Sequence, residues 1–585
     1  MKEKIHLQDL TLSWIEEDVD ESNVGYDEES LEALLPHGPL SNLQQLSLNR
    51  YGGVKIPSGI SSLSNLVKLS LDECNKCQHL PPLDQFHSLK TLSLYKMNDL
   101  EYISERENNG EFSDSSFLPS LEQLTIEECR NLKGWWQRQR DSVEEFHNHS
   151  LPSFPHLSYL HIWECPKLIS LLQEAASESK DSNMKVKIHL QDLKLSWIKE
   201  DVDESDVGYD EELLVALLPH GPPSNLQELC LIRYGGVKLP SAISLLSNLV
   251  KLSLDDCNKC QHLPPLDQFH SLKTLSLYKM NDLEYISERE NNGEFSDSSF
   301  LPSLEQLTIG YCRNLKGWWQ RQRDSVEEFH NHSLPSFPHL SILQIRICPK
   351  LISLPLFPYL EKLELHKCSL KPLEQTLRME VINTATPKNL TSIAATSTSS
   401  SSSLAASSFI PLSKLKSMSI WNMEETLPKE LMCNLISLQH LDIENCCGPL
   451  PLSRHLTALQ NLRVVGSKEV DLTNDGDEME WHGLQSLRKL NFSYLPNLAT
   501  LPVGIQHLTS LQTLEIFNCP SLLAIPEWIC NLNSLQTLQI LDCPILSRRC
   551  EREAGEDWSK IAHIPHLLID RWRTYSYDLE LNQTF

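Results

Sequence analysis

Two pairs of cysteines have the spacing of a metal-binding motif. Cys74-Asn-Lys-Cys77 and Cys257-Asn-Lys-Cys260 each hold two thiols three positions apart, and thiolates at this spacing can bind zinc. A four-ligand zinc site needs a second pair of ligands. Cys74 and Cys257 also have a role in the repeat pattern described below, so we predict that neither pair binds a metal.

Two further motifs carry residue types that could do chemistry. His147-Asn-His149 follows two glutamates and is repeated at His330, but this spacing fits no familiar metal motif and is more typical of a solvated loop. Trp135–Arg140, copied at Trp318–Arg323, mixes aromatic rings with arginines, as nucleic-acid or protein contacts do. We favour a protein contact or simple loop packing because the chain is strongly acidic. No zinc-protease, serine-hydrolase or kinase motif is present, so the sequence predicts no enzyme and no cofactor.

Composition narrows the class of protein further. The chain has 585 residues and a formal net charge of −27, which argues against binding to nucleic acid or to an anionic membrane surface. No run of apolar residues approaches the roughly 18 that a membrane span needs. The 17 cysteines occur without a visible export signal, which favours reduced thiols and a cytoplasmic or nuclear location.

The pattern Leu-x-x-Leu-x-Leu dominates the chain. It occurs at 19 places, from Leu7 to Leu535, with other apolar residues allowed at some positions. The last two apolar residues of each unit are two apart, so on a strand they face the same way, and stacked units would bury them in one continuous core. The pattern therefore predicts an α/β solenoid, a leucine-rich-repeat horseshoe with a parallel β-sheet on its concave face and an irregular or short-helical convex side.

Many cysteines fit the same repeat. They follow the strand at the position where the repeat consensus has Asn or Cys, so we expect buried thiols that need no disulfide partner. The ten residues are Cys74, Cys129, Cys165, Cys257, Cys312, Cys348, Cys368, Cys446, Cys519 and Cys543.

A second, longer repeat organises the chain. Ile5–Leu171 aligns with Ile188–Leu354 without a gap, and 148 of the 167 positions are identical. We predict a first repeat block at 1–172, a connector at 173–187, a second block at 188–354, a continuation at 355–380, a Ser/Thr-rich flexible insertion at 381–408, a C-terminal block at 409–546 and a cap and tail at 547–585. The acidic segments Asp18–Glu29 and Asp201–Glu212 are interpreted as solvated loops, and Ser547–Trp572 as a cap that departs from the repeat. The chain enters its first strand without a cap, so we expect a module upstream.

Several motifs resemble the leucine-rich-repeat region of plant coiled-coil NB-ARC disease-resistance proteins. They include His6-Leu-Gln-Asp-Leu-Thr-Leu-Ser-Trp14, Tyr51-Gly-Gly-Val-Lys-Ile-Pro57 and Gly555-Glu-Asp-Trp558. The resemblance implies a surface that recognises a pathogen effector or a guarded host protein, or that contacts an NB-ARC module supplied upstream. No phosphate-binding loop is present, so nucleotide binding cannot be carried over. A general interaction scaffold, or a decoy or truncated product without the nucleotide switch, is the alternative interpretation.

The differences between the two long copies indicate where a partner would bind. Eleven of the 19 differences fall at 30 positions beside or just after the strand leucines, where between three and four would fall by even scatter. Several change the charge or the aromatic character, as re-specified protein contacts do. We predict a partner surface that includes Gln45, Ser47, Tyr159, His161, Trp163, Glu228, Cys230, Ile342, Gln344 and Arg346.

Overall fold

The computed structural model describes most of the repeat units. The described residues are 7–14, 24–34, 42–104, 118–136, 154–169, 190–197, 207–218, 225–287, 301–319, 337–352, 357, 359–370, 372–373, 412–425, 429–446, 452–466 and 481–570. The predicted connector, the Ser/Thr-rich insertion and the motif around His147 lie outside them. Across the described ranges, no helix is long and apolar enough to cross a membrane.

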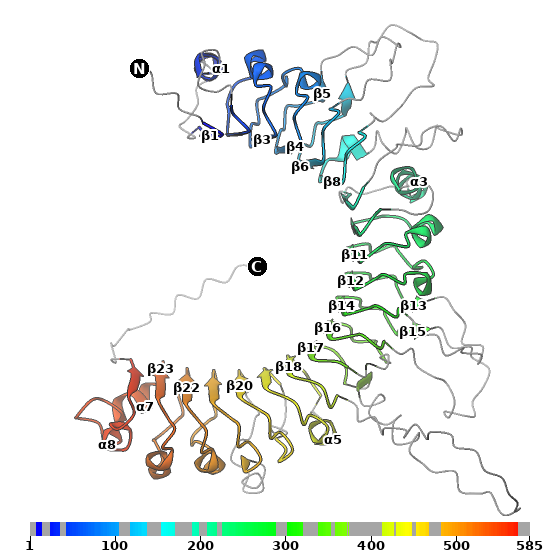
Figure 1. Ribbon diagram of the computed structural model, residues 1–585. Helices are drawn as coiled ribbons and strands as arrows, with labels where there is room; N and C mark the ends of the chain where they lie inside the picture. The colour runs from blue at the N-terminus through cyan, green and yellow to red at the C-terminus, as the bar shows by residue number, and fades with distance from the viewer. Residues whose placement is uncertain are drawn as a thin grey trace, which may run out of the picture. The chain divides into compact units, whose positions relative to one another are not determined.

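The chain forms two compact units. The first comprises Met1–Leu304, Tyr311–Leu315 and Trp319–Phe329, and the second comprises Glu305–Gly310, Lys316–Trp318 and His330–Phe585. Each contains a parallel sheet in which the repeat strands pair in chain order (Figure 1). In the first unit the described sheet strands are β1 (Asp9–Ser13), β2 (Gln45–Asn49), β3 (Lys68–Asp72), β4 (Thr91–Tyr95), β6 (Gln123–Glu127), β8 (Tyr159–Trp163), β9 (Asp192–Ser196), β10 (Glu228–Ile232), β11 (Lys251–Asp255) and β12 (Thr274–Tyr278). In the second unit they are β14 (Gln306–Gly310), β16 (Ile342–Arg346), β17 (Lys362–His366), β18 (Ser417–Trp421), β19 (His440–Glu444), β20 (Asn461–Val465), β21 (Lys489–Ser493), β22 (Thr513–Phe517), β23 (Thr537–Leu541) and β24 (His566–Ile569).

The repeat leucines set the register of these strands. Leu46 lies opposite Leu69, and the same pairing of equivalent leucines continues from strand to strand. Leu46 and Leu48 are fully buried while the residues between them remain partly exposed. Burying one leucine contributes roughly 1.5–3 kcal/mol, and a slip by one residue would turn every leucine of a strand outward. The predicted solenoid with an all-parallel sheet is confirmed.

A shared turn ends nearly every strand. The next residue adopts the left-handed conformation, as at Glu73 (φ 53°), and in the second long copy Ile347 does so at φ 52°. The cysteine then donates its thiol hydrogen to a carbonyl of the preceding repeat, as Cys74 does to Leu48 at 3.4 Å. Nine of the ten predicted cysteines make this bond at 3.4–3.9 Å. Cys368 was also expected to be buried, but it is only partly buried. It follows β17, and the next described strand, β18, comes only after the predicted insertion.

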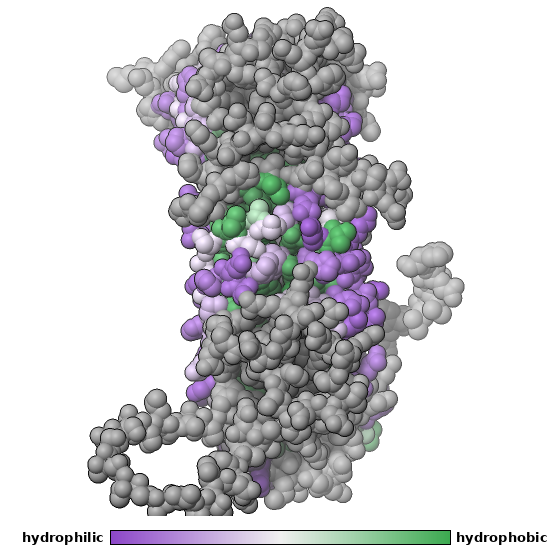
Figure 2. Space-filling view, turned by 90° about the vertical axis from the view of Figure 1, so that its right-hand side faces the viewer, coloured by the Kyte–Doolittle hydropathy of each residue, from purple (hydrophilic) through white to green (hydrophobic). Residues whose placement is uncertain are grey.

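Short helices and loops form the other side of the repeats wherever the structure describes it. The short helices are η2 (Ser58–Ser62), η3 (Leu83–Gln85), η5 (Ser241–Leu245), η6 (Leu266–Gln268), α5 (Lys429–Cys433), η7 (Val503–His507) and η8 (Glu527–Asn531). Four short described strands also lie outside the repeat strands: β5 (Tyr102–Ser104), β7 (Gly134–Trp136), β13 (Tyr285–Ser287) and β15 (Gly317–Trp319). On the side shown in Figure 2, hydrophobic residues (green) gather among hydrophilic ones (purple).

Two of the segments interpreted as acidic loops are helical at their ends. Helices α1 (Val24–Leu34) and α3 (Val207–Leu217) begin within them. Asp210 is only 8% exposed, and its carboxylate accepts a hydrogen bond from the Gly235 backbone N–H at 2.8 Å. Asp27 accepts the equivalent bond from Gly52 at 3.2 Å. Where the structure describes these segments, the prediction of solvated acidic loops was therefore wrong, because the residues are helical and Asp27 and Asp210 accept hydrogen bonds from backbone donors of the following repeat.

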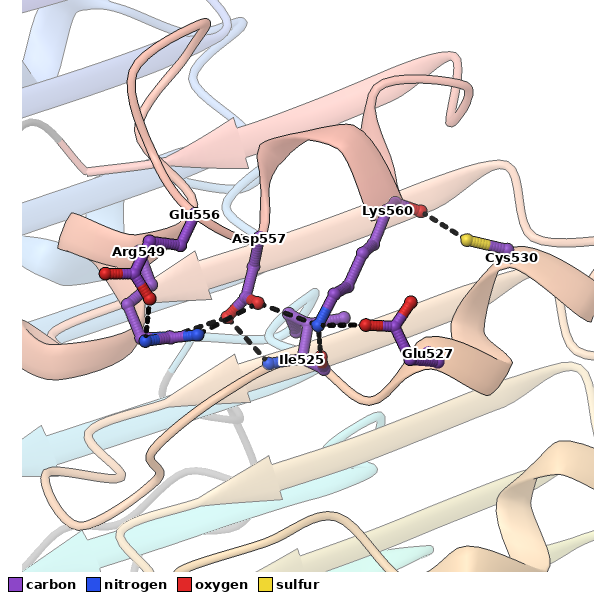
Figure 3. A network of polar contacts seen from close by, with 7 residues as sticks. All are labelled: Ile525, Glu527, Cys530, Arg549, Glu556, Asp557 and Lys560. Atoms are coloured by element: carbon purple, nitrogen blue, oxygen red, sulfur yellow. Dashed lines mark hydrogen bonds and ion pairs between the residues drawn. The ribbon is translucent and has the colours of Figure 1, made fainter.

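The C-terminal segment continues the sheet. Strand β24 pairs with β23 in the repeat register, with Leu567 opposite Leu538, so the cap departs from the repeat less than expected. Helices α7 (Pro544–Arg549) and α8 (Trp558–Ile561) precede it. Asp557, which is 1% exposed, links these helices to the segment just before η8 (Figure 3). Its carboxylate accepts hydrogen bonds from Arg549 of α7 and from the Ile525 backbone N–H, and Lys560 of α8 contacts it at 2.9 Å.

Candidate protein-binding surface

Strand β8 presents three aromatic side chains on the face of its sheet that points away from the leucine core, here called the outer face. Leu160 and Ile162 point inward and are buried, so the alternation of the strand turns Tyr159, His161 and Trp163 outward. All three are half-buried. The rings of Tyr159 and His161 lie 6.3 Å apart edge to face, and those of His161 and Trp163 lie 6.0 Å apart in the same arrangement. The three rings form a continuous row along the strand.

Charged residues of the neighbouring strands flank this row. The ammonium group of Lys194, on β9, lies 5.4 Å from the centre of the Tyr159 ring. His161 Nδ1 lies 3.2 Å from a carboxylate oxygen of Glu127, on β6. Burial, with a smaller contribution from Lys194, lowers the pKa of His161 to about 4. His161 is therefore neutral at pH 7, and it does not neutralise Glu127.

The equivalent strand of the second long copy has a different chemistry. Gln344 and Arg346, on β16, both contact Glu364 of β17, at 2.8 and 3.1 Å. Lys362 contacts the other carboxylate oxygen at 2.7 Å. Glu364 is only 6% exposed, and its cationic and hydrogen-bonding partners hold its pKa below the ordinary value despite its burial. Ile342 points outward beside this polar network.

The structure separates the remaining predicted residues. Glu228 and Cys230 lie on β10, two strands from β8, or about 10 Å at the usual strand spacing. Gln45 and Ser47 lie on β2, four strands from β8 on the other side. The residues of β16 belong to the second unit. The ten predicted residues all occupy outward positions, but they form no single site within a unit.

Three neighbours of these residues were absent from the predicted set. Glu364 and Trp421 lie beyond the duplicated segment, so a comparison of the two copies could not detect them. Trp421 faces outward on β18 and packs edge to face against His366 at 6.2 Å. Lys194 does differ between the copies, where Thr11 is its equivalent. Its place on the strand beside β8 follows from the repeat pattern, but its contact with the Tyr159 ring does not.

The cysteine pairs and the tryptophan motif have structural contacts. Burial raises the pKa of the Cys74 thiol to about 11 and that of Cys77 to about 12, which disfavours the thiolate that zinc requires. Cys77 donates to the carbonyl of His79 at 3.5 Å. In the parts of the chain that the structure describes, no three His, Cys, Asp or Glu residues are grouped to hold a metal ion. Trp135 is buried, and the centre of its ring lies 5.4 Å from that of Phe154. The rest of the motif, Gln137–Arg140, lies outside the described residues.

Two family models match this repeat architecture. The model described as "R13L1/DRL21 LRRs" matches residues 1–97 and 167–280. The model described as "Plant disease resistance protein RPS2-like, leucine-rich repeats" matches residues 406–544. The chain is a leucine-rich-repeat region of the plant NLR disease-resistance family. The repeat region is thus related to defence proteins along most of its sheet.

Individual proteins give the same result for part of the chain. The repeat region is 30% identical over 189 residues to a protein named as disease resistance protein RGA4 in Solanum bulbocastanum, covering 32% of this chain and 18% of the relative. It is 32% identical over 179 residues to one named RGA1 in the same species, covering 30% and 16%. The repeat region therefore spans less than a fifth of these relatives. Among solved structures, a leucine-rich-repeat protein of Leptospira interrogans aligns with 96% of this chain and all of its own at 17% identity and a TM-score of 0.32.

Proposed function

We propose that the NLR repeat region binds a protein through the outer face of β8 and its neighbouring strands, and that this partner is a pathogen effector or a guarded host protein. The observation that carries the proposal is the row of half-buried rings at Tyr159, His161 and Trp163. The middle outward position of β2, β3, β4 and β6 is Ser or Thr, whereas β8 has His161 there. A few residues dominate the binding energy of most protein interfaces, and Trp and Tyr are enriched among them.

The differences between the long copies support this assignment. The second copy replaces the three rings by Ile342, Gln344 and Arg346, and two of these residues bind Glu364. The leucines and isoleucines of the strand motifs do not change between the copies. The sheet has thus kept its core while its outer face changed from aromatic to polar, as expected of a surface whose partner differs.

The proposal assigns binding and no catalytic step to the chain, and it includes an intracellular site of action. The sixteen described cysteines are all free thiols, which is typical of proteins in a reducing compartment. In a longer receptor, the same face could instead contact an NB-ARC module, and the experiment below separates the two partners.

The test exchanges the natural surface of one copy for that of the other. The full chain carrying Tyr159→Ile, His161→Gln and Trp163→Arg has a sequence that the second copy already folds. The control chain carries alanine at Thr537, Gln539 and Leu541, the outward positions of β23. Both are co-expressed in plant cells with individual secreted pathogen proteins, host proteins and an NB-ARC module, and binding is measured by co-immunoprecipitation.

We expect at least one effector or host protein to bind the wild-type and control chains and to lose binding to the exchanged chain. If every protein bound by the wild type also binds the exchanged chain, the proposal is wrong. Loss of the NB-ARC module alone would contradict effector or host-protein sensing and assign the face to an intramolecular contact.

A further inference from the structure

Carboxylates and aromatic rings alternate along one row of the first sheet. The last outward position of four consecutive strands holds Asp72 (β3), Tyr95 (β4), Glu127 (β6) and Trp163 (β8), and the strand register places each opposite the next. We call these four residues the acid–ring row. Neighbouring members are about 4.8 Å apart, the spacing of paired strands.

The row already holds one cation of the chain itself. The ammonium group of Lys96 lies 4.8 Å from the centre of the Tyr95 ring and 3.0 Å from a carboxylate oxygen of Glu73. The side chain thus combines a cation–π contact with an ion pair. This arrangement shows which chemical group fits between a ring and a carboxylate on this face.

The two carboxylates of the row have no such partner. Within the described part of the chain, neither Asp72 nor Glu127 forms an ion pair with Lys or Arg, and Oδ1 of Asp72 is buried without a hydrogen-bond partner. Burial and the carboxylates nearby raise the pKa of both groups, although Lys96 and Arg50 offset part of this rise at Asp72. A cation placed beside them would therefore relieve an unfavourable charge as well as form new contacts.

We propose that the acid–ring row binds the arginine or lysine side chains of a basic segment in the partner protein. This inference rests on the proposed function, since it names the chemistry that the same face would recognise. One basic side chain lies between Glu127 and the Trp163 ring, and a second lies at Asp72. The two carboxylates are two strands apart, or about 10 Å. A peptide in the polyproline II conformation, with three residues per turn and a rise of about 3.1 Å per residue, spans this distance in three residues and keeps both basic side chains on one face.

The second long copy supplies a natural comparison. It keeps Asp255 and Tyr278 at the equivalents of the first two positions, but it has Gly310 and Arg346 in place of Glu127 and Trp163. One carboxylate and one ring are lost together and a positive charge is gained. The strand pair β14–β16, where Gly310 lies opposite Arg346, therefore lacks the carboxylate and the ring that would hold a basic side chain, and Arg346 is itself paired with Glu364.

The test uses synthetic peptides and the full chain. The probe is a fluorescein-labelled Gly/Ser peptide with two arginines three positions apart, compared with peptides in which the arginines are adjacent or replaced by glutamates. Binding is measured by fluorescence anisotropy at low and at physiological salt. The chain variants are Glu127→Gln, the double change Glu127→Gly with Trp163→Arg, and the control Glu122→Gln, which removes an equal charge that is paired with Lys90 outside the row. Circular dichroism establishes that each variant is folded.

We expect Glu127→Gln and the double variant to weaken binding of the spaced peptide by about tenfold or more, as loss of a charged hydrogen bond does, and Glu122→Gln to change it less than twofold. The glutamate peptide should not bind. If Glu127→Gln and Glu122→Gln weaken binding equally, or if adjacent arginines bind as tightly as spaced ones, attraction is due to net charge alone and the inference is overturned. A protein partner that needs the β8 rings but tolerates Glu127→Gln would also overturn it, while leaving the proposed function intact.

Discussion

Replacing Asp557 by Asn should release the C-terminal cap while leaving the rest of the solenoid folded. The buried carboxylate accepts hydrogen bonds from Arg549 Nε at 2.8 Å and from the Ile525 N–H at 3.1 Å, and it pairs with Lys560 at 2.9 Å (Figure 3). Asn keeps the shape but loses the charge that both cations require. Helices α7 and α8 would then be held to η8 less tightly, by the remaining contacts of Lys560 with Glu527 and of Cys530 with the Lys560 carbonyl.

The size of the effect follows from burial. Removing one partner of a buried ion pair costs about 3–5 kcal/mol. The side chains of Arg549 and Lys560 are 32% and 17% exposed, so solvent compensates part of this loss and we expect about 2–3 kcal/mol. At about 1.36 kcal/mol per factor of ten, amides that exchange through opening of the cap should exchange about 30- to 150-fold faster.

Hydrogen exchange followed by mass spectrometry measures this directly. Peptides from β23, β24 and α8 should lose protection, while peptides from β3 and β4 should not change, because each repeat contacts only its neighbours. Glu556→Gln is the matched control, since Glu556 also pairs with Arg549 but its side chain is 74% exposed. Equal exchange in the two variants, or faster exchange throughout the chain, would refute the reasoning.

The pH dependence gives a second readout of the same carboxylate. Its hydrogen-bond donors and cationic partners hold the pKa of Asp557 below its ordinary value. A depressed pKa contributes stability above the unfolded value of about 3.9, and this stability is lost as the pH falls through the folded value. The difference in cap protection between wild type and Asp557→Asn should therefore be full near neutral pH and shrink below about pH 4.

Two further predictions test the repeat turn and the thiols. Ile347→Asn should stabilise the second unit by about 1 kcal/mol in chemical denaturation, because a β-branched residue is strained at φ 52° and Asn tolerates the left-handed conformation; unchanged or lower stability would contradict this reading of the turn. Iodoacetamide at pH 8 should label the exposed Cys433 in the native protein but label Cys74 and Cys77 only after denaturation. Both of these thiols are buried, and burial raises their pKa values to about 11 and 12. Labelling is measured by mass spectrometry of the peptides, and labelling of Cys74 in the native protein would show that the prediction is wrong.

The repeat pattern allowed the core to be predicted in detail. Leucines two positions apart can be buried together only on a strand, and units of this size can be buried only by stacking. All 19 motif positions lie on strands of the two parallel sheets. Strand β24 was missed because its motif, Ile564-Pro-His-Leu567-Leu-Ile569, begins with isoleucine, and the mixed charges of the surrounding cap hid the same periodicity.

The candidate surface could be predicted only in part. Whether a residue faces outward follows from its place in the repeat, so Tyr159, His161 and Trp163 could be assigned to one face from the sequence. The differences between the long copies then singled out β8. The comparison could not reach Glu364 or Trp421, because neither has a counterpart within the duplication.

The sequence by itself determined the period, the inward face of each strand and the role of the cysteines after it, because these depend on positions within a single repeat. Only the tertiary structure decided which outward side chains meet. Gln344 and Glu364 are twenty residues apart yet share a hydrogen bond, and Lys194 reaches Tyr159 across a strand pair. Loops of different length separate successive strands, but the sheet brings them to one fixed spacing of about 4.8 Å. Contacts between side chains of neighbouring strands therefore depend on that spacing and on rotamers, which a linear pattern does not specify.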